Sequence, residues 1–433
     1  MENKMEKIIS LAKRRGFIYQ GSEIYGGLGG TWDYGPLGTE LKNKLKQSWW
    51  KKFVQQRSDI YGIDASILMN KDVWVATGHV EHFSDPLVEC SKCKKRFRAD
   101  QLDGSLCPEC EGELGDVRQF NMMFKTQVGS LEDSASTSYL RPETAQGIFV
   151  NFKNIVDSFH PNMPFGIAQI GKAFRNEITP RDFLFRAREF EQMEIEYFVT
   201  PNTWEEHFDR WRRGIIDWLR SVGLTLEKLH ENNIPQDELA HYSKRTIDFE
   251  YDFPFGRKEL MGLAYRTDFD LARHSEMSGA NLEYFDQING EHFIPHVIEP
   301  SFGIDRLVLA LLLDAYHEEE VAGEQRVVMK LDKSIAPIQI AILPLMKKDG
   351  LADFAKNVFE RLSHHFVCHY DETGSIGKRY RRQDEVGTPY AITIDYDSLE
   401  QNTVTVRDRD TMDQKRIPVD ELRAYFEEQY RYE

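Results

Sequence analysis

The sequence predicts an α+β protein in which an antiparallel-sheet domain precedes a smaller α/β domain. Extended segments at residues 165–174 and 190–199 flank a charged, arginine-rich loop, a pattern typical of an antiparallel hairpin with a long tip. The last 100 residues show three short apolar strands and one helix, at 338–343, 391–394, 404–406 and 351–366. Alternation of strands and helices over about 100 residues predicts a separate α/β domain that begins near residue 336.

A long amphipathic helix is expected after Gly35, because Pro36 suits the first turn of a helix. Apolar side chains then recur every three to four positions, at Leu37, Leu41, Leu45, Trp49, Trp50 and Phe53. The other expected elements are helices at 4–15, 204–229 and 304–315 and strands near 247–253 and 294–299. These elements supply the core of the first domain.

Composition restricts the class of protein. Hydrophobic residues make up 41% of the chain and aromatic residues 12%, as in a globular protein, and no apolar run approaches the roughly 20 residues of a membrane span. The first seven residues lack the apolar core of an export signal, so a cytoplasmic location is expected. The net charge of −16 argues against general coating of nucleic acid and leaves room only for a specific, local footprint.

Four of the five cysteines form two close pairs, Cys90/Cys93 and Cys107/Cys110, separated by thirteen residues. In a cytosolic chain this spacing predicts a tetrahedral zinc site more readily than disulfides, unliganded thiols or a redox pair. Because all four ligands come from the protein, such a site is structural rather than catalytic. Cys368 stands alone and reads as a small buried apolar residue.

Arginines follow the first strand of the predicted hairpin. Arg175 can fork onto a phosphate, and Glu177, two residues later on the same face, can accept a hydrogen bond from the amine of a base. The loop adds Arg181, Arg186 and Arg188. An exposed hairpin held by salt bridges would carry the same residues, so this motif alone is a weak signal.

A second motif, Gly303-Ile304-Asp305-Arg306, follows a strand and opens an apolar helix. A helix N-terminus favours anions, and Arg306 could hold an outer phosphate; an ordinary strand-to-helix turn remains open. Glu259 and Glu299 are candidate ligands for Mg²⁺, which prefers hard oxygen donors that bridge to phosphates. Either could equally be a structural ion-pair partner.

Taken together, three segments resemble motifs 1, 2 and 3 of the class II aminoacyl-tRNA synthetases. They are Gly-Pro-Leu-Gly at 35–38, Phe-Arg-Asn-Glu at 174–177 and Gly-Ile-Asp-Arg at 303–306. Longer stretches are similar to glycyl-tRNA synthetases of the homodimeric type, and they lie at 24–27, 32–38, 141–147, 188–194, 377–385 and 387–389. The resemblance extends almost from end to end.

The resemblance implies a domain plan and a reaction. A class II catalytic domain would occupy 1–330, with motif 1 near 33–57, motif 2 near 165–199 and motif 3 near 294–316. A zinc-knuckle insertion would span 86–118 and an anticodon-binding domain 336–433. The implied reaction is ATP-dependent attachment of glycine to tRNA(Gly) through a glycyl-adenylate, by a homodimer. The Mg²⁺ and the structural zinc ion expected above would serve as its metals.

The resemblance also implies site residues. Arg175, Arg306 and Glu259 would be catalytic, with Arg175 on the α-phosphate and Arg306 on the γ-phosphate. ATP would further contact Asn176, Glu177, Phe185, Arg186, Ala187, Arg188, Glu189, Phe190, Leu260, Gly303, Ile304 and Asp305. Glycine would contact Arg98, Glu143, Phe190, Glu191, Gln192, Met193, Glu194, Glu299, Pro300, Ser301, Phe302 and Gly303.

The tRNA footprint is expected in the last domain, although residues 336–433 carry 14 Lys and Arg against 18 Asp and Glu. Its positive charge gathers at Lys378, Arg379, Arg381, Arg382, Arg407 and Arg409. The alternative is a face balanced by neighbouring acids. Two other functions are possible. One is a synthetase for threonine, proline or histidine, which the stretch 141–147 disfavours. The other is a non-catalytic relative, but such relatives lose the motif arginines, which are present here.

Overall fold

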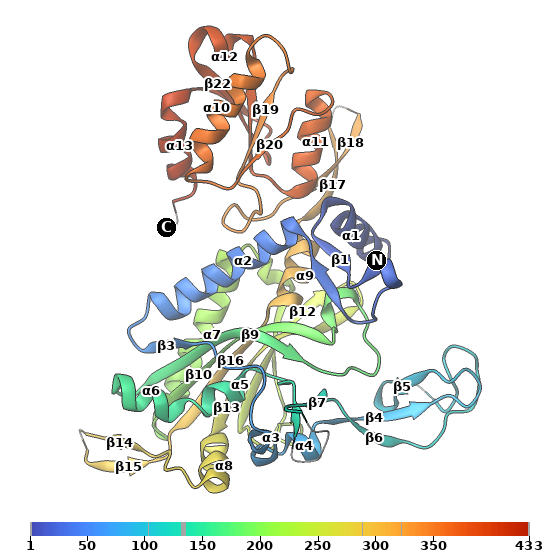
Figure 1. Cartoon of the computed structure of the whole chain (residues 1–433), viewed down its shortest axis with the longest axis vertical. Coiled ribbons are helices and arrows are strands. Elements are labelled where there is room, and N and C mark those ends of the chain that lie inside the picture. Colours follow the sequence, from blue (N-terminus) through green and yellow to red (C-terminus); the bar gives the residue numbers. More distant parts are fainter. Residues whose placement is uncertain (1, 103, 131–135, 288, 322, 432–433) are drawn as a thin grey trace.

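A seven-stranded sheet forms the centre of the molecule (Figure 1). The computed structural model describes residues 2–102, 104–130, 136–287, 289–321 and 323–431. In order across the sheet, the strands are β11 (Leu229–Asn233), β12 (Arg245–Phe253), β13 (Gly256–Thr267), β16 (His296–Gly303), β10 (Glu189–Val199), β9 (Phe165–Phe174) and β3 (Ile60–Ile63). All neighbours are antiparallel except β3 and β9. The predicted hairpin is confirmed as β9 and β10, which pair from Glu189↔Phe174 to Phe198↔Phe165.

One face of this sheet packs on helices. They are α2 (Pro36–Trp50), α7 (Trp204–Ser221) and α9 (Ile304–Ala315), with α1 (Glu2–Arg15) beside them. The apolar stripe of α2 is confirmed, since Leu41, Leu45 and Trp49 are fully buried. Trp49 and Trp218 meet Phe302 of the sheet at ring distances of 5.8 and 5.5 Å. This face holds the main hydrophobic core.

Within the described part of the chain, helices cover the opposite face at one end. There α5 (Ala145–Phe149), α6 (Phe152–Phe159) and α8 (Phe269–Ser278) pack on Phe165, Ile167 and Phe198. Because side chains alternate along a strand, Glu194 and Glu196 of β10 lie on this face, while Met193 and Ile195 enter the main core. The uncovered part of the face is where a site can form.

A small peripheral unit and several short elements flank the central sheet. A three-stranded sheet of β4 (Ser84–Glu89), β5 (Arg96–Arg98) and β6 (Arg118–Asn121) projects from the body and carries the cysteine pairs (Figure 1). The short elements elsewhere are β1 (Ile18–Gln20), β2 (Trp32–Tyr34), α3 (Lys71–Ala76), α4 (His79–His82), β7 (Lys125–Gln127), β8 (Thr137–Tyr139), β14 (Tyr284–Asp286) and β15 (Glu291–Phe293).

The C-terminal region forms its own five-stranded sheet with a separate core. Its strand order is β20 (Cys368–Tyr370), β19 (Ile340–Pro344), β21 (Tyr390–Ile394), β22 (Thr403–Asp408) and β23 (Gln414–Pro418). The helices are α10 (Leu351–Ser363), α11 (Ile376–Val386), α12 (Tyr396–Gln401) and α13 (Leu422–Gln429). The hairpin β17 (Tyr316–Val321) and β18 (Glu324–Met329) joins it to the first region. The expected alternation of strands and helices is confirmed.

Some boundaries differ from expectation. The helix expected over 204–229 ends at Ser221, because Gly223 adopts φ +85° and the chain then turns into β11. The longest strand, β13, was not expected, since its first half reads Gly-Arg-Lys-Glu and lacks an apolar alternation. Among the described residues, no helix is long and apolar enough to cross a lipid bilayer.

Candidate active site

A cavity of about 440 Å³ opens on the uncovered face of the central sheet. It brings together the two stretches that the sequence analysis singled out, although about 130 residues separate them. The predicted residues that line it are Glu143, Arg175, Glu177, Phe185, Arg186, Ala187, Phe190, Gln192, Glu194, Glu259, Leu260, Glu299, Ser301, Gly303, Asp305 and Arg306. One end is rich in arginine and the other in carboxylates.

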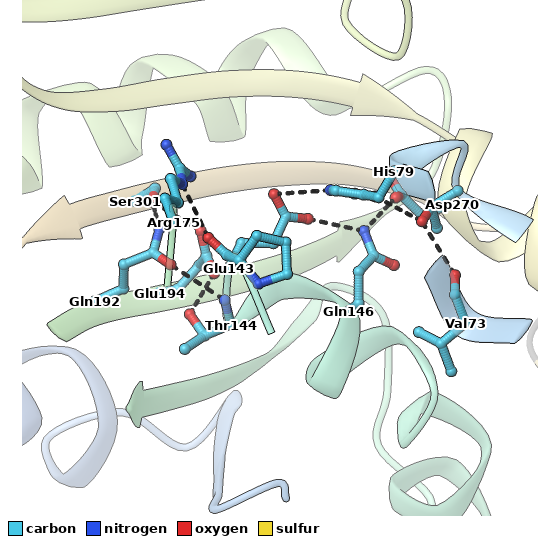
Figure 2. Close-up of polar contacts among 12 residues, drawn as sticks. Val73, His79, Glu143, Thr144, Gln146, Arg175, Gln192, Glu194, Asp270 and Ser301 are labelled. Atoms are coloured by element: carbon cyan, nitrogen blue, oxygen red, sulfur yellow. Dashed lines mark hydrogen bonds and ion pairs between the residues drawn. The ribbon is translucent and has the colours of Figure 1, made fainter. Parts of the chain in front are cut away.

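Arg175 stands where β9 ends. Its Nε donates to the carbonyl oxygen of Pro142 at 3.0 Å, and its guanidinium lies 5.3 and 5.2 Å from the ring centres of Phe83 and Phe190. These contacts fix the direction of the side chain through Nε. Arg175 lines the cavity, and its two terminal nitrogens form the fork that suits a phosphate. Figure 2 shows Arg175 together with Glu143 and Glu194.

The hairpin loop brings an arginine and a glutamate close together without a hydrogen bond between them. Arg186 Nη1 lies 3.8 Å from Glu177 Oε2, too far for a hydrogen bond, and within the described part of the chain both buried atoms lack a hydrogen-bond partner. Burial, together with the positive charge of Arg98 and other arginines, lowers the pKa of the Arg186 guanidinium despite Glu177. Buried polar atoms without partners are costly, so this geometry is suited to a polar ligand.

Arg306 points into the cavity from the first turn of α9. Its Nη1 lies 3.0 Å from Glu259 Oε2, and its guanidinium carbon lies 4.4 Å above the ring of Phe185. Arg306 holds the pKa of Glu259 below its ordinary value against the effect of burial. The two arginines therefore flank a position where an extended anion would fit, with an aromatic ring beside it.

Asp305 has a different role from its neighbour. Its Oδ2 accepts from the backbone N–H of Glu191 at 2.7 Å, and its Oδ1 accepts from Tyr34 at 2.5 Å and Lys42 at 3.2 Å. These bonds tie α9 to β10, β2 and α2. Asp305 therefore fixes the position of the arginine that follows it.

The opposite end of the cavity is acidic (Figure 2). Glu194 accepts from Thr144 Oγ1 and, at 2.7 Å, from Ser301 Oγ. Glu143 accepts from Gln146 Nε2 at 3.1 Å, and its other oxygen lies 3.3 Å from His79 Nε2. Burial alone would raise the pKa of Glu143, but His79 and more distant Arg266 hold it well below its usual range.

A buried arginine that sequence reasoning missed underlies these acids. Arg266 of β13 binds Asp270 through Nε and Nη2, both at 2.8 Å, and Glu299 through Nη1 at 2.5 Å. Even so, burial and the charge of Glu194 raise the pKa of Glu299 to about 8, with Arg266 opposing them. No local signal separated it from a structural residue: Arg266 follows the apolar run 260–265 of β13, and Asp270 comes four residues later.

Several predicted residues lie outside the cavity lining. Met193, Phe302 and Ile304 face the main core, because strand and helix geometry turns them away. Glu191 pairs with Lys42 at 2.9 Å, and Pro300 is buried in β16. We therefore leave these five residues out of the set that we propose to contact ligands.

The remaining predicted residues bind other protein groups near the cavity. Arg188 donates to the carbonyl oxygens of Gly29 at 2.5 Å and Glu177 at 3.0 Å, which closes the hairpin loop. Asn176 donates its backbone N–H to Met122, and Glu189 pairs with Lys172. Arg98 pairs with Asp85 at 2.6 Å and Asp100 at 2.7 Å, at the base of the projecting sheet. Among the described residues these four do not line the cavity.

The four cysteines converge in the projecting sheet. All four Sγ atoms lie within 4.8 Å of one another, with 3.5 Å between Cys90 and Cys110 and 3.6 Å between Cys93 and Cys107. Zinc–sulfur bonds of 2.3 Å place tetrahedral sulfurs about 3.8 Å apart, so the spacing fits one ion. A Cβ at Gly112 would approach Cys90 Sγ to 3.0 Å, which explains a glycine at that turn. The cluster could hold zinc.

The expected basic footprint of the C-terminal region is partly wrong. Arg379, Arg407 and Arg409 are buried. Arg379 donates to backbone carbonyls, including Pro344 at 2.5 Å, and Arg407 pairs with Asp384 at 3.0 Å. For these three the balanced, structural alternative holds. Lys378, Arg381 and Arg382 remain as the more exposed cations of α11.

Comparison with known proteins places this geometry in a family. Residues 124–316 match the tRNA synthetase class II core domain (G, H, P, S and T), and residues 339–429 match an anticodon binding domain. A glycine–tRNA ligase of Caldanaerobacter subterraneus subsp. tengcongensis is 52% identical, with 99% of each chain covered. The chain belongs to the glycine–tRNA ligase family of class II synthetases.

Other relatives agree over their full lengths. The glycine–tRNA ligase of Treponema denticola is 55% identical over 96% of this chain and 95% of its own. That of Acetivibrio thermocellus is 54% identical over 99% and 98%. The resemblance drawn from the three motifs is thereby confirmed, and so is the expected pair of class II core and anticodon-binding domains.

Proposed function

We propose that this chain attaches glycine to tRNA(Gly) with ATP, through a glycyl-adenylate formed in the cavity described above. One observation supports the assignment of this site: a single cavity holds two phosphate-suited arginines at one end and a buried cluster of carboxylates at the other. ATP fits the first end, and the ammonium group of an amino acid without a side chain fits the second.

The chemistry requires positioning and charge stabilisation rather than a side-chain nucleophile. Glycine's carboxylate attacks the α-phosphorus, and pyrophosphate leaves as the adenylate forms. Arg175 would stabilise negative charge on the α-phosphate, and Arg306 would hold the γ-phosphate. Glu177 would accept from the adenine amine, with Arg186 as a further phosphate contact. Orienting both reactants in one cavity supplies much of the acceleration.

Mg²⁺ would neutralise phosphate charge in this reaction. Glu259 and Glu299 were the candidate ligands. Glu299 is bound by Arg266 and lies among other acids at the amine end, whereas Glu259 lies beside Arg306 at the phosphate end. We therefore propose Glu259 as the protein ligand.

Glycine recognition rests on Glu143, Glu194 and Ser301, with Glu299 behind them. Three carboxyl groups around one ammonium give charge recognition, and Gln192 holds Ser301 at 3.4 Å. Because glycine has no side chain, discrimination must come from exclusion at Cα. A methyl group added to a filled pocket clashes, which makes rejection of alanine the easier direction.

Further parts of the proposal concern assembly. We assign the catalytic domain to 1–330, the insertion to 86–118 and the anticodon-binding domain to 336–433. The cysteine cluster would hold one structural zinc ion. A homodimer would cover apolar side chains of the loop before β2, where Ile24 is 90% and Tyr25 87% exposed.

An exchange assay tests the function. The protein is incubated with ATP, labelled pyrophosphate and one amino acid at a time, from a panel of glycine, alanine, serine, threonine, proline and histidine. Glycine alone should support label transfer into ATP. Exchange that depends on threonine, proline or histidine instead would assign the chain to another synthetase. If none of the amino acids supports exchange, the chain would be a non-catalytic relative.

A further inference from the structure

A carboxyl group that neither the motifs nor the proposed function use lies directly behind the amine end of the cavity. Glu196 of β10 is fully buried and does not line the cavity. Within the described part of the chain neither of its carboxyl oxygens has a hydrogen-bond partner. An ionised carboxylate buried in this way would be strongly destabilising, so its environment must hold it uncharged or supply a cation.

Cross-strand pairing places Glu196 against another acid. In the register of β10 and β16, Glu194 lies opposite Ser301 and Tyr197 opposite Ile298, which sets Glu196 opposite Glu299. One oxygen each of Glu194, Glu196 and Glu299 lies within 4.8 Å of the others. Like charges directly opposite on neighbouring strands repel, and in a buried site they cannot all be ionised.

The charge balance of the cluster is incomplete. The charged and titratable groups that face Glu196 or its immediate neighbours are Glu194, Glu299, Asp270, Glu143, Arg266 and His79. With Glu196 itself, five carboxyl groups meet one arginine and one histidine. Tyr242, 3.9 Å from the guanidinium of Arg266, closes the cluster from the side. Even with both of these cations charged, three carboxyl groups have no counter-charge, so bound protons must neutralise part of the cluster.

We propose that Glu196 and Glu299 hold protons in the empty site, and that the ammonium group of glycine displaces a proton from this pair when it binds. Glu196 is then a positioning residue, because it tunes the charge of Glu299 and Glu194 without touching the substrate. This inference rests on the proposed function.

The step balances in protons and charge. Glycine enters as a zwitterion, and a carboxyl O–H bond in the Glu196/Glu299 pair breaks. The proton leaves to water, and the carboxylate that remains faces the ammonium group. Burial and the neighbouring acids raise the pKa of both Glu196 and Glu299, so the empty site is protonated near neutral pH. A bound cation favours the ionised form.

Calorimetry measures this coupling directly. Glycine is titrated into the full-length protein without ATP, at pH 7.5, in three buffers that differ in ionisation enthalpy. The slope of the observed enthalpy against the buffer enthalpy counts protons, and about one should be released per glycine bound. Glycine affinity should accordingly tighten by up to about tenfold per pH unit until the pH reaches about 8.

Two variants separate the inference from a structural role. Glu196→Gln keeps the shape and removes one of the two carboxyl groups that share the displaced proton, so proton release should fall by at least half. Asp314→Asn is the matched control. The Asp314 carboxylate is also buried, but it lies in α9 on the opposite face of the sheet and pairs with Lys228 at 2.5 Å. This variant should leave the proton count unchanged.

The outcomes are distinct. Glycine binding without proton release, or equal release by wild type and Glu196→Gln, would overturn this inference and leave the proposed function intact. If Glu196→Gln does not fold, difference infrared spectra of the wild type decide: a protonated-carboxyl band should disappear on glycine binding, and an unchanged band would contradict the inference. An absence of any glycine binding would remove the proposed function, and this inference with it.

Discussion

Two buried clusters of charge in this protein are built in opposite ways. At the amine end of the cavity, five carboxyl groups meet one arginine and one histidine, and Glu196 has no hydrogen-bond partner within the described residues. In the C-terminal region, Arg326 and Arg407 converge on Asp384 at 2.8 and 3.0 Å. Arg326 also donates to the carbonyl oxygen of Arg409 at 2.6 Å and pairs with Glu319.

The difference separates structure from function. A buried ion cluster whose donors and acceptors are matched holds elements together, here β18, α11 and β22. A buried cluster with surplus charge of one sign is a site prepared for a ligand of the other sign. The two clusters also differ in how they respond to pH. Carboxylates can bind protons to relieve repulsion, whereas arginines cannot lose theirs.

The largest effect is expected at the arginine end. Arg175→Ala removes the group that stabilises developing charge on the α-phosphate, so the rate of glycine-dependent pyrophosphate exchange should fall by about a thousandfold or more. Arg379→Ala is the control, because that arginine also bonds to backbone carbonyls but does not line the cavity. It should lower the melting temperature and spare exchange. Retained exchange in Arg175→Ala would refute its role.

Removing one partner from each cluster tests the contrast in protonation. Asp384→Ala leaves buried guanidinium groups that cannot neutralise, so the free energy of unfolding should fall by about 3–5 kcal/mol at every pH. Arg266→Met leaves carboxylates that can bind protons, so its loss should be smaller at pH 5 and should grow toward pH 8. Denaturant titrations of both variants across this range measure it. Equal, pH-independent losses would remove the distinction.

A further effect, confined to one pH window, follows from Glu299 alone. Because folding raises the pKa of this carboxyl to about 8, the native state binds a proton that the unfolded chain releases above its ordinary value near 4.5. Its contribution to stability therefore decreases as pH rises between these values, by up to about 1.4 kcal/mol per pH unit. The stability difference between Glu299→Gln and wild type should shift in favour of the variant over this window. A constant difference would show that Glu299 is ionised throughout.

The cysteine cluster should give the smallest effect on chemistry. It is a third kind of site, closed by four sulfurs and outside the cavity lining. Elemental analysis should find about one zinc per chain, and Cys107→Ser should abolish zinc binding while changing exchange less than tenfold. A fully active, zinc-free wild-type preparation would reduce these cysteines to ordinary thiols.

Sequence reasoning succeeded where the signal is local. The β9–β10 hairpin, the stripe of α2 and the cysteine pairs follow from spacing alone, and the family followed from three motifs in order. It was less successful where every residue of a continuous stretch was expected to contact a ligand. Met193 and Phe302 belong to such stretches, but strand alternation turns them into the core.

The remaining site residues depend on distant elements. Arg266, Asp270 and His79 lie in β13, α8 and α4, and nothing local distinguishes them from structural residues. Arg407 and Arg409 show the converse case. Their charges suggested a tRNA-binding surface, but in the structure they pair with Asp384 and Asp410. Pairing of buried charge is a property of the tertiary structure.

The position of the ligand amine tests the central claim most directly. A crystal structure of the protein with glycine and a non-hydrolysable ATP analogue should place the glycine nitrogen within hydrogen-bond distance, about 2.7–3.2 Å, of carboxylate oxygens of Glu143 and Glu194. Its carboxylate should face Arg175. An amine bound away from these acids, or a glycine carboxylate turned toward them, would contradict the account.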